Sequence, residues 1–203
     1  MKKSFLLFAA IILICSTAPA QNSKAARTKQ IRAAYAAALQ SSAPAEEPRA
    51  QNVIRAKVQH CFPGTGLQYW DVDIFHYGDF DDECSEYKAA PYFVRAKTNL
   101  HDCAGRKLLA EYLYDGDARP MFLFKTEENV FAETDILIEY RYYFYEDGSL
   151  CDFILKVKDR TTGQYLSEKN MPDLFESING EDWKERLEDF EDYKRVTSAL
   201  IDF

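Results

Sequence analysis

The sequence lacks the short motifs by which many enzymes are recognised. It contains no G-x-S-x-G nucleophile elbow, no P-loop, no glycine-rich dinucleotide fingerprint and no H-E-x-x-H zinc motif. Positive charge is also scarce: 25 Lys and Arg residues stand against 33 Asp and Glu, which gives a formal net charge of −8. Binding to nucleic acid or to an anionic membrane surface relies on clustered Lys and Arg, so this balance argues against both kinds of partner.

The chain begins with a predicted signal peptide. Lys2 and Lys3 form a basic start, residues 5–15 are apolar, and the A-P-A at residues 18–20 fits the small-x-small cleavage rule. We therefore expect residues 1–20 to be removed and the mature chain to be exported, either to the periplasm or out of the cell.

Two alternatives assign the apolar run to the membrane. A permanent anchor is disfavoured because the run is shorter than the ~20 residues of a membrane span, so we expect no span in the mature chain. Lipid anchoring through Cys15 is the second alternative. Ile14, which precedes this cysteine, is bulky where a lipoprotein signal requires a small residue.

A tight hairpin is predicted over residues 134–158, around a turn at Asp147-Gly148 that can supply positive φ. Apolar side chains recur at every second position on both sides of the turn: Ile136, Ile138, Tyr140, Tyr142, Phe144, Cys151, Phe153, Leu155 and Val157. Five earlier segments alternate in the same way, at residues 52–60, 67–77, 90–99, 106–115 and 119–126. No connection needs a crossover helix, so the pattern predicts an antiparallel meander.

Helical periodicity is found on both sides of these strands. Residues 23–40 are rich in alanine, with Ile31, Tyr35 and Leu39 recurring every four residues. After a predicted short helix at residues 171–178, residues 181–203 form a second predicted helix. One side of it, at helical spacing, is lined by Trp183, Leu187, Phe190, Lys194, Thr197 and Ile201, and Val196 and Leu200 widen this side.

The predicted fold class is therefore α+β. We expect an antiparallel meander sheet of about seven strands, with an N-terminal helix and a C-terminal helix packed on one face. Residues 21–50 comprise the N-terminal helix and a proline-containing linker, and residues 51–203 comprise the α+β domain.

Export and the meander together predict two disulfides. Four cysteines follow the signal peptide, and an even number in an exported protein suggests pairing. Successive turns of a meander alternate between the two ends of the sheet. Cys61 and Cys103 therefore share one end, and Cys84 and Cys151 share the other. These are the two pairs that we predict.

Two metal sites are weaker alternatives. The acidic loop carries Asp79, Asp81, Asp82 and Glu83, whose hard oxygen ligands suit Ca²⁺, although the glycine and distal glutamate of an EF-hand are missing. Zinc could be bound by His60, Cys61, His101 and Cys103, but their spacing is not that of a standard zinc site. We expect a solvated loop and a disulfide in their place, and no cofactor.

Side chains on the strands supply two further hypotheses. Asp71, Asp73, Glu111 and Glu139 are candidates for the acid and base of a carboxylate-dependent, sugar-active hydrolase, although strand carboxylates are normally only solvated. Tyr143 and Tyr145 lie on the face opposite Tyr140, Tyr142 and Phe144. They indicate either that both faces of the sheet are covered or that one of them is a ligand surface.

Several segments resemble a loose group of small, uncharacterised exported proteins of Bacteroides-type Gram-negative bacteria. These segments are residues 30–38, 92–95, 111–115 and 141–144. The resemblance implies export from a Gram-negative cell and transfers no activity or site residue.

The sequence as a whole favours an exported, non-enzymatic binding or interaction protein with an unknown protein or glycan partner. The hydrolase is one alternative. An envelope-associated structural protein, held by an N-terminal helix that stays detached from the domain, is the other.

Overall fold

The computed structural model describes residues 23–43, 52–63, 66–77, 90–100, 106–129, 135–178 and 180–201. Eight antiparallel strands form one sheet in the order β1 to β8, so each strand pairs with its neighbour in the sequence. The predicted meander and the α+β class are confirmed. The strands are β1 Val53–Phe62, β2 Gly66–Tyr77, β3 Ala90–Leu100, β4 Arg106–Tyr114, β5 Pro120–Asn129, β6 Ile136–Phe144, β7 Leu150–Asp159 and β8 Tyr165–Leu166.

The eighth strand is the one that the sequence did not predict. β8 has two residues, too few for the alternation of side chains that reveals a strand. The predicted helices are found as α1 (Lys24–Ser41), α2 (Pro172–Ser177) and α3 (Trp183–Ile201). In the part of the chain that the structure describes, no helix is long and apolar enough to cross a membrane.

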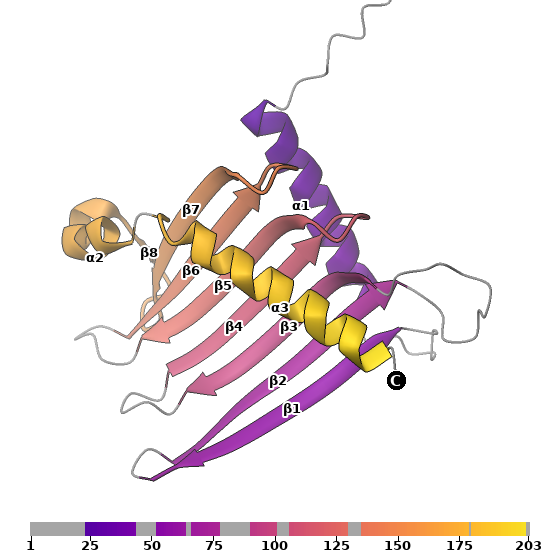
Figure 1. Ribbon diagram of the computed structural model, residues 1–203. Coiled ribbons are helices and arrows are strands. Elements are labelled where there is room, and N and C mark those ends of the chain that lie inside the picture. The colour runs from indigo at the N-terminus through magenta and orange to yellow at the C-terminus, as the bar shows by residue number, and fades with distance from the viewer. Residues whose placement is uncertain are drawn as a thin grey trace, which may run out of the picture.

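The two long helices cover opposite faces of the sheet (Figure 1). On one face, Phe190 of α3 is fully buried and its ring meets those of Tyr112, Tyr114 and Phe144 edge-on, at centroid distances of 5.1, 5.0 and 5.8 Å. On the other face, Ile31 of α1 is fully buried. The prediction that both helices share one face is therefore wrong in this detail. Both faces of the sheet carry aromatic residues, so each face needs a helix to shield it from water.

The surface under α1 is a row of cross-strand neighbours. Its members lie side by side in the register of the sheet and are largely buried: Val53, Phe75, Phe93, Leu113, Phe122 and Tyr143. We call them the apolar row. The α1 side chains that pack on this face include the predicted Ile31, Tyr35 and Leu39. The docked helix does not meet the expectation of a detached N-terminal tether.

Three irregularities in the register complete this second core. The register shifts near the connections β2–β3, β4–β5 and β6–β7, and each shift leaves one residue extra: Tyr92, Met121 and Cys151. All three pack in the α1 cluster. A β-bulge turns its extra residue out of strict alternation. This is why Cys151 faces α1 and not the side of Phe153, as the alternation predicted.

The central turn forms as expected. Gly148 adopts φ of +79°, Tyr145 N–H donates to the Ser149 carbonyl at 2.9 Å, and the Asp147 carboxylate accepts from the Ser149 amide at 2.9 Å. The hairpin places β6 and β7 side by side and supplies side chains to both cores.

Part of the predicted α3 stripe is not buried. Val196 and Leu200 are 41% and 49% exposed, whereas Tyr193 joins the residues packed against the sheet. Trp70 shares the α3 face of β2 with Ile74 but is half exposed. Sequence periodicity identifies which side of a helix or strand is apolar. It does not show how far along that side the packing between α3 and the sheet extends.

Candidate functional site

Charged side chains follow the apolar row on the α1 face of the sheet. The next row of neighbours reads Arg55, Asp73, Arg95, Glu111, Phe124, Arg141 and Ile154. The row after it reads Lys57, Asp71, Lys97, Leu109, Thr126, Glu139 and Lys156. Charges of opposite sign alternate along both rows, an arrangement that stabilises cross-strand pairs.

This arrangement locates the four carboxylates proposed for a hydrolase. Each lies beside a cation: Asp73 is 3.4 Å from Arg55, Asp71 is 3.5 Å from Lys57, Glu111 is 2.7 Å from Arg95 and Glu139 is 2.8 Å from Arg141. Each carboxylate is paired with its own cation, including Asp71 and Asp73, which share one face of β2. Three of these are cross-strand ion pairs, and Glu139–Arg141 is a pair within β6.

A cavity of about 350 Å³ lies between α1 and the sheet, close to these pairs. We call it the arginine–aromatic pocket, and its lining residues are Ile31, Arg32, Tyr35, Phe122, Phe124, Arg141 and Tyr143. The aromatic rings pack on one another: the centroid of the Phe122 ring lies 4.8 Å from that of Tyr35 and 4.8 Å from that of Tyr143. Such contacts fix the rings and give the pocket a rigid apolar wall.

The polar part of the pocket comes from two guanidinium groups. Arg32 donates from Nε to the Tyr143 hydroxyl at 3.4 Å, and its guanidinium lies 5.7 Å from the centre of the same ring. Arg141 lies 5.4 Å from the Phe124 ring and is paired with Glu139. Among the described residues, no carboxylate lies within ion-pair distance of Arg32. One of the two cations therefore has no carboxylate in direct contact, although the charge of Asp152 acts on it from beyond ion-pair distance.

A buried hydrogen bond supports the wall of the pocket. The Tyr35 hydroxyl donates to the Glu111 carboxylate, which also accepts from Arg95 and is 5% exposed. The pKa of Tyr35 is raised well above its usual value, mainly by burial and secondly by this hydrogen bond. Tyr35 therefore stays a neutral donor. The contact links α1 to β4 at the middle of the helix.

Arg27 anchors α1 nearer its N-terminus. This side chain is almost fully buried, and its Nε donates to the carbonyl of Phe144 at 3.0 Å. Its Nη1 donates to Gln30 at 3.1 Å and lies 3.6 Å from Glu146. A buried guanidinium that is bound to the end of β6 fixes the helix along its axis.

The predicted aromatic residues are divided between the cores and the pocket. Tyr143 is 2% exposed and lines the arginine–aromatic pocket, and Tyr145 is partly buried against the α1 cluster. They lie on the opposite face to Tyr140, Tyr142 and Phe144, as predicted, but α1 covers that face. Tyr143 and Tyr145 therefore do not form an open ligand surface.

The cysteine and metal predictions fall largely outside the described residues, which exclude Cys84, Cys103, His101, Asp79, Asp81, Asp82 and Glu83. Cys61 is an exposed and Cys151 a buried free cysteine. The meander puts the β1–β2 and β3–β4 connections at one end of the sheet and the β2–β3 and β6–β7 connections at the other. Within the described segments, no three His, Cys, Asp or Glu side chains are grouped so that they could hold a metal ion.

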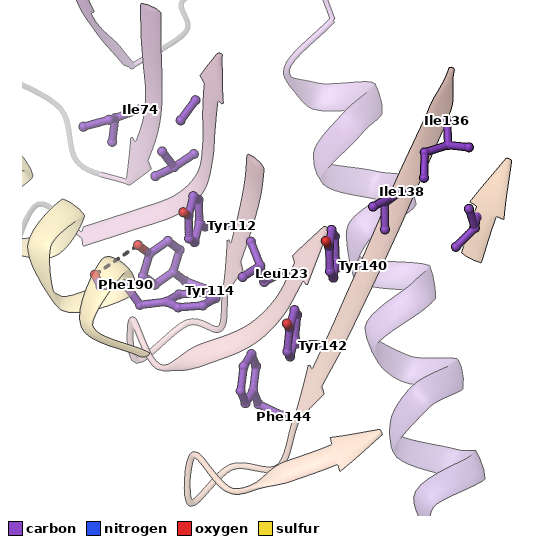
Figure 2. Close-up of a cluster of buried hydrophobic side chains, with 13 residues drawn as sticks. Ile74, Tyr112, Tyr114, Leu123, Ile136, Ile138, Tyr140, Tyr142, Phe144 and Phe190 are labelled. Carbon is purple, nitrogen blue, oxygen red and sulfur yellow. Dashed lines mark hydrogen bonds between the residues drawn. The ribbon is translucent and has the colours of Figure 1, made fainter. Parts of the chain in front are cut away.

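A second polar cluster lies under α3, where tyrosines of the sheet bind the helix. Tyr142 donates to Asp182 at 2.7 Å, Tyr112 to Asp189 at 3.1 Å, and Tyr114 to the Phe190 carbonyl at 3.1 Å. Figure 2 shows these rings within the buried cluster, with the Tyr114 bond drawn. Asp182 directly precedes α3 and Asp189 lies on it, and their bonds to Tyr142 and Tyr112 show that both face the sheet. The three bonds hold α3 in place.

Burial changes the titration of this cluster. Desolvation raises the pKa of Tyr112, Tyr114 and Tyr142 well above the usual value, and raises that of Tyr193 to about 12. Desolvation likewise raises the pKa of Asp189 and lowers that of Lys125. These shifts come from a packed helix–sheet interface and not from an open cleft, so we assign the cluster to stability.

No protein-family model, no curated protein and no solved structure matches the chain. Any functional inference therefore rests on the sites themselves. Sequence reasoning missed Arg32, Tyr35 and Arg141 as a group. Arg32 lies on a helix and Arg141 on a strand 109 positions later, and no local motif connects them.

The tyrosine cluster predicts a loss of stability in alkali. A tyrosine whose folded-state pKa is raised keeps its proton in the folded protein. The stability that it contributes is therefore complete below the unfolded value of about 10 and is lost as the pH rises above it. We expect the absorbance step of Tyr112, Tyr114 and Tyr142 ionisation to coincide with loss of circular dichroism. Reversible ionisation of every tyrosine before unfolding would contradict the assignment.

Proposed function

We propose that this chain is an exported, non-enzymatic binding protein that holds a small organic anion in the arginine–aromatic pocket. The observation that carries the proposal is the Arg32 guanidinium, which has no carboxylate partner among the described residues and lies beside fixed aromatic rings. An anionic ligand group would supply the missing partner.

The dimensions of the pocket define the size of the ligand. Small-molecule sites have volumes of ~300–1,000 Å³ and combine apolar walls with a few polar groups. At about 350 Å³, this pocket lies at the lower end of that range. Phe122, Phe124 and Tyr143 give the pocket aromatic walls, with the Phe122 and Tyr143 rings tilted at 44° to each other, and a single planar ring matches the volume and the lining.

The charge of the pocket defines the ligand's polar end. A guanidinium binds a carboxylate through two parallel hydrogen bonds, which gives both affinity and orientation. Arg141 is already paired with Glu139, so its charge is partly compensated, whereas Arg32 has its Nε on a neutral hydroxyl. The ligand class is therefore an aromatic carboxylate with its charged end toward Arg32.

The two alternatives receive less support. The hydrolase requires two carboxylates that face the same space, and here the nearest partners of Asp71, Asp73, Glu111 and Glu139 are cations. The tethered envelope protein requires a detached N-terminal helix, and α1 buries Ile31 completely. Helix docking is also what builds the pocket, which favours binding as the role of α1.

The pocket is tested by titration with phenylacetate, followed by amide chemical shifts. We expect saturable shifts at Arg32, Tyr35 and Tyr143, with affinity at least roughly tenfold weaker for neutral phenylacetamide, since hydrogen bonds to charged groups are the stronger ones. Arg32→Gln should weaken phenylacetate binding by about the same factor and leave phenylacetamide unchanged.

Lys29→Gln is the matched control. Lys29 lies one turn earlier on α1 but does not line the pocket, so its removal should not change phenylacetate affinity. Equal binding of the acid and the amide, or absence of saturable shifts at the pocket, would refute the proposed ligand class.

Export and disulfide pairing are tested on protein recovered from a Gram-negative host carrying the full gene. We expect intact mass and non-reducing peptide mapping to give a mature start at Gln21 and to show that export oxidises Cys61 and Cys151, which are free in the structure, to the links Cys61–Cys103 and Cys84–Cys151. A Cys61–Cys84 link would contradict the pairing, because the meander places these residues at opposite ends of the sheet. Retention of residues 1–20 would contradict export by signal cleavage.

A further inference from the structure

The first strand forms a long open edge of the sheet. β1 has ten residues and pairs with β2, and among the described residues no strand lies on its other side. At the opposite edge of the sheet, β8 has only two residues. A long edge presents unpaired N–H and C=O groups that another extended chain can pair with.

The unpaired groups can be assigned to particular residues. His76 N–H donates to the Asn52 carbonyl at 3.0 Å, and Asn52 and His76 lie one step beyond the pair Val53–Phe75. Hydrogen-bonded pairs recur at every second residue of an antiparallel ladder. The N–H and C=O groups of Arg55, Lys57 and Gln59 therefore point away from β2, toward the open edge.

Both charged rows on the α1 face of the sheet end in a cation on β1. One row begins Arg55, Asp73, Arg95, Glu111, and the other begins Lys57, Asp71, Lys97. Each aspartate on β2 lies between two cations, while Arg55 and Lys57 have an acidic neighbour on one side only. A carboxylate on a strand beyond β1 would continue both alternating series.

The α3 face of the same edge is apolar. Ile54, Ala56 and Val58 alternate with the two cations, and Val58 and its neighbour Trp70 are 48% and 50% exposed. Exposed Trp is a residue type that often dominates binding energy at interfaces. A strand added at this edge would lie directly beside Val58 if its apolar side chains faced the same way, and it would extend the apolar face that Trp70 of β2 shares.

A second copy of the chain does not supply the required charges. β1 carries no Asp or Glu, and antiparallel pairing of two β1 strands about Ala56 would set Arg55 of one opposite Lys57 of the other. Like charges directly opposite each other destabilise a strand pair, and edge cations commonly prevent self-association.

From these observations we propose that β1 is a docking edge for an extended peptide segment of another protein, in which acidic and apolar residues alternate. The segment pairs antiparallel with β1, places carboxylates opposite Arg55 and Lys57, and lays its apolar side chains beside Val58, on the face that also carries Trp70. It thereby repeats the Asp-Val-Asp-Ile alternation of β2 at residues 71–74. This site is separate from the arginine–aromatic pocket, and either one can fail without the other.

The probe is a blocked nine-residue peptide that alternates Glu and Val, labelled for fluorescence anisotropy. We expect saturable binding that weakens as salt is raised, and binding at least about tenfold weaker for the peptide with Gln in place of Glu. The double variant R55Q/K57Q should weaken binding of the Glu peptide by a similar factor. Lys169→Gln, a lysine outside the sheet, is the matched control and should change nothing.

A backbone variant separates strand pairing from simple charge attraction. Gln59→Pro removes an N–H that points away from β2 and leaves both cations in place, so the sheet should keep its circular dichroism while the peptide no longer binds. If this variant misfolds, R55Q/K57Q decides the question alone. Equal binding of the Glu and Gln peptides, unchanged binding by R55Q/K57Q, or a concentration-dependent homodimer abolished by R55Q/K57Q would each overturn the proposal.

Discussion

The whole structure depends on the need to cover both faces of one sheet. Each face carries buried aromatic residues, so an eight-stranded sheet with one helix would leave a large apolar surface in water. Helix α3 covers one face through Phe190, and α1 covers the other through Ile31. The N-terminal helix is thus part of the folded domain, although it comes before the first strand and contains many alanines that bury little area.

The rows of cross-strand neighbours explain where the two proposed sites lie. On the α1 face, the row that the helix covers is apolar, and the next two rows alternate in charge. The arginine–aromatic pocket forms where α1 lies over the border between the apolar row and the first charged row. Phe122 of the apolar row and Arg141 of the charged row therefore line one cavity. The docking edge lies where the charged rows reach the last strand, β1. Both sites thus follow from one pattern of side chains on one face.

Alternation of side chains was enough to predict the strands, the meander and the two long helices, because those patterns are local. The three bulges were not predicted. Tyr92, Met121 and Cys151 each break the alternation by one residue, and a single extra residue leaves no visible mark in a sequence pattern. The pocket also escaped prediction, since Arg32, Phe122 and Arg141 come together only when α1 docks. The carboxylates were identified correctly as strand residues, but their cationic partners became evident only from the register.

The central claim is that α1 belongs to the domain, and native-state hydrogen exchange tests it most directly. Most helical stability in proteins comes from tertiary packing, so strong protection of the α1 amides has to come from docking. We predict that the amides of residues 28–38 open with a free energy within about 1 kcal/mol of that of β5 and β6, as one cooperative unit. Exchange of α1 at rates typical of a frayed helix, while the sheet stays protected, would contradict the account and remove the wall on which the pocket depends.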